Sequence, residues 1–354
     1  MHALRPRDAS RALVAIIPTR QSVLFVGKPG GGKSSLVYQA ASQIYNGPTY
    51  ISTVTGLPDH PWWVVIRATD RDPVDLRGIP YVKDGQTYWS VPDLIRLLRP
   101  EGGVICIEEL PQAMPAVQCV LRELLLDHRI GGVKIPDKWT VVATGNRVED
   151  NAGARKLLSH VESSVVKIEL ATSNEDWQAW ALQAGVSPEV RRFLEMRPEL
   201  LDQFNPARSE NNDPRAWERV SILAQAVPED LMLPVLAGVV MPGSASEFIG
   251  FRRIYKDLPD LKEIFQSPEA ADVSTDTSVN YALTGALIEA ARPKKGKLQE
   301  LSNLITYADR LPEIFGILLM RDLLVVRPET LKLPEAKGWL KKEEIRGLVL
   351  GGVK

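Results

Sequence analysis

A glycine-rich stretch near the amino terminus has the residue types and the spacing of a phosphate-binding loop. Residues 27–34 read Gly-Lys-Pro-Gly-Gly-Gly-Lys-Ser, so that four residues separate Gly27 from Gly32 and the pair Lys33-Ser34 follows, which is the Walker A spacing. Glycines let the backbone turn its N–H groups inward around a phosphate, where a Cβ would not fit. In such a loop Lys33 reaches the β- and γ-phosphates, and the Ser34 hydroxyl ligates Mg²⁺. The pattern predicts a nucleotide-binding site, and we call residues 27–34 the P-loop.

The segments on either side of the P-loop agree with this prediction. An apolar strand is expected before it, at Val23–Val26, and a helix after it, at Ser35–Ile44. The N-terminus of a helix attracts anions because its free N–H groups and its dipole both favour negative charge. The alternative is a glycine-rich turn that matches by accident, and both flanks argue against it. The residues expected to hold the nucleotide are Gly27, Pro29, Gly30, Gly31, Gly32, Lys33, Ser34 and Ser35.

Two adjacent carboxylates end a later apolar strand. Residues 104–107 are Val-Ile-Cys-Ile, and Glu108 and Glu109 follow them. In a P-loop enzyme the first carboxylate at this place holds the Mg²⁺ shell, and the second polarises the attacking water. We therefore assign Glu108 to magnesium and Glu109 to the water. Taken alone, such a pair is usually a solvated strand end, but its position after the P-loop favours the functional interpretation.

Two further polar residues are candidates for contact with the γ-phosphate. Asn146 follows the apolar strand Thr140–Thr144, and an amide at the carboxyl edge of a parallel strand beside the P-loop can orient the lytic water. The alternative is an Asn that serves the turn alone. Arg215 lies in the first turn of a helix that begins at Asp213-Pro214, where the dipole disfavours a cation and an anionic partner is therefore expected. The alternative is an exposed arginine paired with Glu218.

Composition and charge narrow the classes of protein. The chain has 354 residues with 43 Lys and Arg against 44 Asp and Glu, a net charge of -1, whereas a protein that grips nucleic acid over a long footprint is usually strongly basic. Cys106 and Cys119 lie in apolar sequence without metal-type spacing, so a disulfide framework is excluded and a reducing compartment is expected. We find no apolar run long enough for a membrane span and no targeting segment, so a cytoplasmic location is expected.

The hydrophobic pattern divides the chain into an α/β part and helical parts. Up to about residue 172, β-rich runs alternate with helical stretches, which is typical of βαβ units and a parallel sheet. After residue 173 no strand is expected, and helix caps such as Ser187-Pro188 and Gly185 take over. The five expected strands are Ser22–Val26, Trp63–Ala68, Gly103–Ile107, Thr140–Thr144 and Val165–Leu170, with a hairpin at Arg129–Trp139.

Several phrases make the sequence resemble the AAA+ ATPases of the MoxR branch, over residues from about 10 to 225. The resemblance implies an α/β fold, an AAA+ P-loop NTPase core with a five-stranded parallel sheet in residues 1–172. A helical lid in 173–226 and a helical extension in 227–354 would follow it. In the family's terms Glu109 is the catalytic Walker B residue, Asn146 the sensor-1 residue and Arg215 the sensor-2 arginine. The matching phrases are Asp72–Pro80, the Glu108-Glu109 strand, Pro115–Gln118, Ala143–Asn146 and Pro214–Trp217.

The chain departs from the pattern of that branch in two places. Relatives usually end the Walker B strand in Asp-Glu, and the extra methylene of Glu108 favours a water-mediated contact to Mg²⁺ and slower turnover. Relatives also commonly carry an arginine finger in the stretch that aligns with residues 157–170, where this chain has no arginine. Arg155 is the nearest substitute and is the expected finger acting on a neighbouring subunit, with Arg129 and Arg147 as the others. The alternative for Arg155 is an ordinary exposed loop arginine.

The resemblance implies Mg-dependent ATP hydrolysis that drives chaperone-like remodelling of another protein. The cofactors would be ATP and Mg²⁺, and the assembly would be a homo-oligomeric ring, expected to be a hexamer. A partner with a von Willebrand factor A domain is common in the branch. A rival class is a nucleotide-gated scaffold that binds ATP with little hydrolysis, which the altered strand and the missing finger favour. A nucleic-acid motor comes third because of the charge balance.

Overall fold

The computed structural model describes residues 3–47, 59–150, 153–258, 261–292 and 298–341. The chain forms two compact units. The α/β unit comprises Met1–Asp176 with Phe204–Ser209 and Asp213–Arg215, and the helical unit comprises Trp177–Gln203, Glu210–Asn212 and Ala216–Lys354. The expected boundary between a lid and an extension, near residue 226, falls inside the helical unit and stays a prediction.

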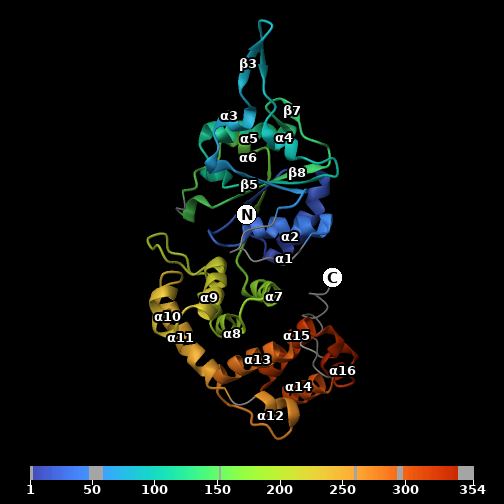
Figure 1. The fold of residues 1–354 in the computed structure, drawn as a ribbon, viewed down its shortest axis with the longest axis vertical. Helices are drawn as coiled ribbons and strands as arrows, with labels where there is room; N and C mark the ends of the chain where they lie inside the picture. Colours follow the sequence, from blue (N-terminus) through green and yellow to red (C-terminus); the bar gives the residue numbers. More distant parts are fainter. Residues whose placement is uncertain (1–2, 48–58, 151–152, 259–260, 293–297, 342–354) are drawn as a thin grey trace. The chain divides into compact units, whose positions relative to one another are not determined.

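A five-stranded parallel sheet forms the centre of the α/β unit (Figure 1). Its strands lie in the order β2-β5-β8-β1-β9, and each neighbouring pair is parallel. The order places β1 between β8 and β9, so that the loops after β1, β5 and β8 open at the same edge of the sheet. The five predicted strands are confirmed, with bounds β1 (Val23–Val26), β2 (Trp63–Arg67), β5 (Gly103–Glu108), β8 (Trp139–Gly145) and β9 (Val166–Glu169).

Alternate residues of the strands face two separate hydrophobic cores. Leu24 and Val26 of β1 pack in the core that contains α5 (Pro115–Asp127). Val23 and Phe25 pack in the core that contains α1 (Pro6–Ile16) and α2 (Lys33–Tyr45). Because successive side chains of a strand point to opposite faces, burial on both faces requires continuous apolar runs. This is why the strands could be recognised in the sequence.

Shorter elements surround the sheet. The predicted hairpin before β8 is confirmed as β6 (Arg129–Ile130) paired with β7 (Val133–Lys134). A second hairpin, β3 (Pro80–Lys83) with β4 (Gln86–Trp89), was not predicted and projects from the unit in Figure 1. Its turn residues Asp84 and Gly85 have φ values of 54° and 73°, as the favoured Asp-Gly hairpin turn requires. The remaining helices of the unit are α3 (Pro73–Arg77), α4 (Asp93–Leu97) and α6 (Ser159–Glu162).

The chain after β9 is helical, as predicted. Its described residues contain no strand beyond one isolated bridge between Gln203 and Asn212. At the start of α8 the Ser187 hydroxyl accepts the N–H of Val190 at 3.4 Å, which confirms that predicted cap. None of the described helices is long and apolar enough to span a membrane. The helices are α7 (Asn174–Ala184), α8 (Pro188–Met196), α9 (Pro214–Ala226), α10 (Glu229–Leu236), α11 (Pro242–Lys256), α12 (Leu261–Gln266), α13 (Thr277–Ala291), α14 (Leu298–Arg310), α15 (Glu313–Val326) and α16 (Ala336–Trp339).

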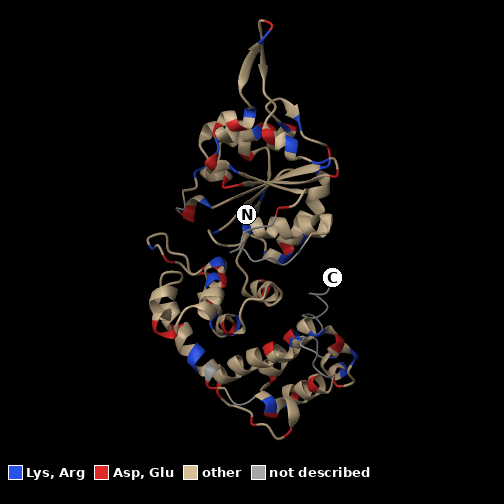
Figure 2. Cartoon of the chain, viewed as in Figure 1, with Lys and Arg blue, Asp and Glu red and all other residues tan. Residues whose placement is uncertain are grey.

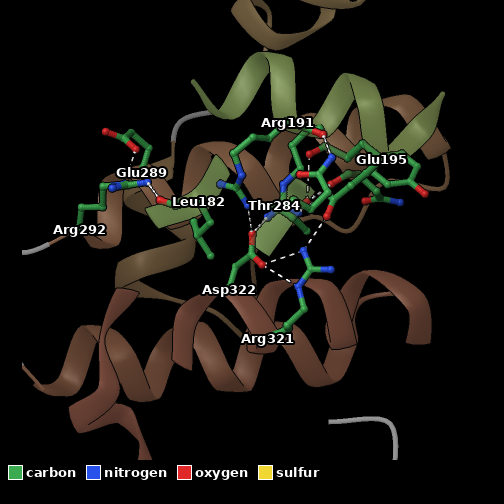
Figure 3. Close-up of polar contacts among 12 residues, drawn as sticks. Leu182, Arg191, Glu195, Thr284, Glu289, Arg292, Arg321 and Asp322 are labelled. Carbon is green, nitrogen blue, oxygen red and sulfur yellow. Dashed lines mark hydrogen bonds and ion pairs between the residues drawn. The ribbon is translucent and has the colours of Figure 1, made fainter. Parts of the chain in front are cut away.

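A network of charged side chains connects α8 to α15 inside the helical unit (Figure 3). Asp322 accepts hydrogen bonds from Arg191 and Arg192 through Oδ2 and from Arg321 through Oδ1. Glu195 accepts further bonds from Arg192 and Arg321. Burial alone would raise the pKa of Asp322, but the three guanidinium groups hold that pKa far below its usual range. The network therefore keeps its carboxylate ionised in a core where an unpaired charge would be costly.

Candidate nucleotide-binding site

Most of the predicted site residues line one cavity of about 1100 Å³ in the α/β unit. They come from the loop after β1, the end of β5, the turn after β8 and the start of α9. Gly27, the first residue of the P-loop, is buried, and Arg155 lines a smaller cavity of about 200 Å³. Ligand pockets commonly range up to about 1000 Å³, so the larger cavity has room for a nucleotide. The predicted residues that line it are Pro29, Gly30, Gly31, Gly32, Lys33, Ser34, Ser35, Glu108, Glu109, Asn146 and Arg215.

The P-loop has a backbone that favours glycine at its turns. Gly30 and Gly32 have φ values of 69° and 78°, in the left-handed region. A Cβ on Gly30 would lie only 2.2 Å from Cγ of Asp213, so a side chain there is excluded by contact as well. Directly after Gly32, α2 begins at Lys33 and its first residues line the cavity. The first turn of α2 is therefore available to an anion, as the sequence predicted.

Lys33 is the cation at the centre of the loop. Its Nζ donates hydrogen bonds to the carbonyls of Gly27 and Lys28 at 3.0 and 2.6 Å, and to Oδ1 of Asn146 at 3.0 Å. Burial lowers the pKa of Lys33 to about 8, and the positive charge of Arg215 adds to the lowering. An ammonium group that is desolvated in this way gains from an anionic partner. The environment of Lys33 therefore favours a phosphate.

The two carboxylates at the end of β5 have different partners. Glu108 lies opposite Arg67 in the β2–β5 register, and Nε of Arg67 is 3.5 Å from its Oε2. Glu109 has a φ of 60° and accepts the Thr69 hydroxyl through Oε2 at 2.8 Å. A left-handed conformation at a residue other than glycine costs about 1–3 kcal/mol and concentrates at functional sites. Sequence reasoning missed Arg67 and Thr69. Both are polar residues at the carboxyl end of β2, and polar residues at that end of a parallel strand are the signal that could have found them.

The turns that carry Glu109 and Asn146 pack against each other. A Cβ on Gly145 would lie 2.2 Å from Cδ of Pro111, which belongs to the short 3₁₀ turn after Glu109. Only a glycine lets the two turns approach so closely. The N–H of Arg155 donates to the carbonyl of Pro111 at 3.0 Å. The close approach of Gly145 to Pro111 fixes Glu109, the candidate base, relative to Asn146, the candidate amide.

The three arginines considered for a finger have different surroundings. The side chain of Arg155 is exposed and lines the smaller cavity together with Asn146. Arg129 donates to the carbonyl of Gly132 at 2.8 Å within its own hairpin. Arg147 is held in its own chain by Asp150 and a second carboxylate, which argues against a reach to another subunit. The finger assignment of Arg155 stays a prediction.

Two residues that line the cavity carry oxygen donors of the kind that Mg²⁺ prefers. These donors are the Ser34 hydroxyl and the Glu108 carboxylate. No cluster of three or more His, Cys, Asp or Glu that could hold a metal occurs in the described part of the chain, so an ion here depends on the nucleotide's own oxygens. Asp72 and Asp75 instead cap α3, with the N–H of Asp72 donating to Oδ2 of Asp75 at 2.9 Å.

Comparison with known proteins supports the same fold. Residues 22–162 match the family model of the AAA domain, dynein-related subfamily. No curated protein matches the sequence. The AAA+ P-loop fold class, with its five-stranded parallel sheet followed by helices, is confirmed by the family match and the sheet topology.

Solved structures with some likeness share little sequence with this chain. A RuvB variant from Thermotoga maritima is 14% identical over 73% of this chain and 78% of that chain, with a TM-score of 0.37. NtrX from Brucella abortus in complex with ATP is 14% identical over 96% and 68%, with a TM-score of 0.38. A DNA polymerase III gamma subunit-related protein from Thermotoga maritima is 12% identical over 91% and 99%, with a TM-score of 0.34. At these TM-scores the likenesses carry no argument about function.

Proposed function

We propose that this protein, whose AAA-like region contains a complete P-loop, is a Mg-dependent ATPase. The observation that carries the proposal is the convergence on one cavity of Lys33, Glu108, Glu109, Asn146 and Arg215. These residues supply a phosphate cradle, a metal ligand, a base and two groups for the γ-phosphate. The match to the AAA domain supports nucleotide hydrolysis in general.

Binding would use the backbone and the first turn of α2. The P-loop N–H groups and Lys33 would hold the β- and γ-phosphates, for which Lys33 would exchange its present bonds to the carbonyls of Gly27 and Lys28. Ser34 and Glu108 would hold Mg²⁺, which when bound neutralises phosphate charge and polarises the phosphoryl oxygens. Arg215 would contact the γ-phosphate from the same cavity.

Hydrolysis would use Glu109 as the base. Its Oε2 is held by the Thr69 hydroxyl, which leaves Oε1 to accept a proton from the attacking water. Asn146 would orient that water, and its own position is fixed by the bond from Lys33. The new bond forms between the water oxygen and the γ-phosphorus, while the bond to the β,γ-bridging oxygen breaks.

The finer assignment follows the sequence resemblance. We propose a MoxR-type remodelling ATPase that works in the cytoplasm as a homo-oligomeric ring, with a protein substrate or a von Willebrand factor A-domain partner. Arg155 would act on the neighbouring subunit, supported by its exposed side chain beside Asn146. Basic and acidic residues are interspersed in both units (Figure 2), which gives no support to a nucleic-acid motor.

A second candidate function is a nucleotide-gated scaffold that binds ATP with little hydrolysis. The observation that favours it is the Glu108–Arg67 pair, because Arg67 Nε lies 3.5 Å from the carboxylate that would have to face Mg²⁺. A longer side chain and a competing cation both weaken a metal site.

Calorimetric titration with ATP and Mg²⁺, followed by phosphate release with and without duplex DNA, separates the candidates. The ATPase predicts binding and steady turnover that DNA does not change. Binding without turnover supports the scaffold, and stimulation by DNA supports the motor. Absence of binding overturns the proposal altogether.

A further inference from the structure

Arg147, the residue after Asn146, donates hydrogen bonds to two carboxylates of its own chain and forms a longer ion pair, at 3.6 Å, with a third, Glu149. Its Nε and Nη2 donate to the two oxygens of Asp150 at 3.0 and 2.8 Å, and its Nη1 donates to Oε1 of Glu169 at 3.1 Å. Asp150 is buried, with 6% of its surface exposed. A bidentate arginine–carboxylate pair fixes the orientation of both side chains as well as their distance. All three nitrogens of this guanidinium are therefore committed within the α/β unit.

The partners of Arg147 lie on either side of the strand that leads into the P-loop. Val26, the last residue of β1, is in register with Gly145 of β8 on one side and with Glu169 of β9 on the other. Arg147 follows Gly145 by two residues and bonds Glu169, so its side chain links the ends of the two strands that flank β1. The N–H of Gly27 donates to the carbonyl of Gly145 at 3.3 Å. The link therefore lies where the P-loop begins.

We infer that Arg147 is a positioning residue for ATP hydrolysis, which holds Asn146 in place from within its own chain through Asp150 and Glu169. The inference rests on the proposed ATPase function. Asn146 contacts the P-loop directly, because its Oδ1 accepts a hydrogen bond from Nζ of Lys33 at 3.0 Å. Arg147 fixes the turn that presents this amide, and it touches neither substrate nor water itself.

An arginine is required here because of its shape. The planar guanidinium satisfies Asp150 with two nitrogens and still presents a third to Glu169, whereas a lysine has a single nitrogen on a flexible stem. Arg147→Lys keeps the positive charge beside Asp150, so it avoids the large cost of a buried unpaired carboxylate. The substitution removes only the fixed arrangement of the two bonds to Asp150 and the bond to Glu169. This makes it the informative variant.

The test measures kcat and KM for ATP in Arg147→Lys, Asn146→Ala and the double variant. A small displacement of a catalytic group costs about a hundredfold in rate, so we expect Arg147→Lys to lower kcat about tenfold to hundredfold with KM changed less than threefold. The double variant should be no slower than Asn146→Ala alone, because residues that act through one another are not additive. The matched control is Arg5→Lys, since Arg5 also bonds two carboxylates of the α/β unit, Glu175 and Asp176. Its kcat should equal that of the wild type.

Three outcomes overturn the inference while the ATPase proposal stands. They are an unchanged kcat in Arg147→Lys, rate losses that multiply in the double variant, and recovery of turnover when Arg147→Lys subunits are mixed with Lys33→Ala subunits. The last result would make Arg147 a finger for the neighbour. A wild-type protein without turnover overturns the proposed function and this inference with it. If Arg147→Lys fails to fold, Glu169→Gln keeps the Asp150 pair and must show a smaller loss of kcat in the same direction.

Discussion

The two units contain arginine–carboxylate networks of opposite charge balance. Beside the P-loop, Arg147 forms ion pairs with Asp150, Glu169 and Glu149, so one cation is shared by three anions. In the helical unit three arginines meet Asp322 and Glu195, so the cations are in excess. The first network is partly exposed and is attached to a turn that lines the nucleotide cavity. The second is buried between helices and contributes no residue to that cavity.

The difference in location between the two networks suits them to different roles, one in positioning a site residue and the other in packing helices. The helical network joins α8 to α15, and within the described residues Arg191 Nε and Nη1 and Arg192 Nε have no hydrogen-bond partner in the protein. Burial lowers the pKa of Arg191, and the positive charge of Arg192 adds to the lowering. This network links two packed helices, whereas the other is attached to the turn that carries Asn146. The chemistry of the groups is the same, and their surroundings decide the role.

The largest expected effect is on the stability of the helical unit. Asp322→Asn leaves three guanidinium groups with Glu195 alone, and breaking such a buried network costs about 3–5 kcal/mol. We expect this loss in the free energy of unfolding, measured by denaturant titration with circular dichroism. Arg191→Met is the matched variant, because it leaves two arginines against two carboxylates and should cost less. An equal or larger loss in Arg191→Met would contradict the charge balance described above.

The next effect belongs to the α/β unit and to binding. Lys33→Ala removes the cation of the P-loop, and we expect ATP affinity to fall at least about a hundredfold because charged hydrogen bonds to phosphate are lost. Calorimetry measures the affinity, and thermal melting should show little change in stability. Lys28→Ala is the control, since Lys28 belongs to the same loop but does not line the cavity. Near wild-type affinity in Lys33→Ala would refute the nucleotide site.

The local features of this fold could be predicted from the sequence, and the long-range ones could not. The strands and the P-loop depend on continuous apolar runs and on motif spacing, which are local. Arg67 faces Glu108 only because β2 and β5 pair in a particular register, and Asp213 reaches Gly30 from far along the chain. In each of these two contacts, the sequence around one residue contains no pattern that indicates its partner. The β3–β4 hairpin is different, because the Asp-Gly dipeptide at residues 84–85 is by itself a local hairpin signal.

A smaller effect concerns the metal-binding carboxylate. Glu108→Asp restores the shorter side chain and withdraws it from Arg67, so we expect turnover to be unchanged or a few-fold higher, measured as phosphate release at saturating Mg²⁺. Glu108→Gln removes the charge and should be slower than both. If the Asp variant is slower than the Gln variant, the reach of this side chain is not what limits the metal site.

Binding of ATP should also depend on pH through Lys33. Burial lowers the pKa of Lys33 to about 8, so its charged form is lost as the pH rises through that value. Because the charged form binds phosphate, ATP affinity should be steady below pH 7 and fall about tenfold between pH 7 and 9. Titrations across this range measure it, with Lys33→Arg as the control that stays protonated. An affinity that does not change up to pH 9 would contradict the desolvated environment of Lys33.

The central claim is that this cavity hydrolyses ATP with Glu109 as the base, and a single-turnover measurement tests it most directly. ATP is mixed with an excess of wild-type protein or of Glu109→Gln, and affinity and hydrolysis are measured on the same samples. Gln keeps the size and the hydrogen bonding but cannot take a proton, so we expect affinity within a few-fold of wild type and hydrolysis at least about a hundredfold slower. Equal hydrolysis rates in the two proteins would contradict the claim.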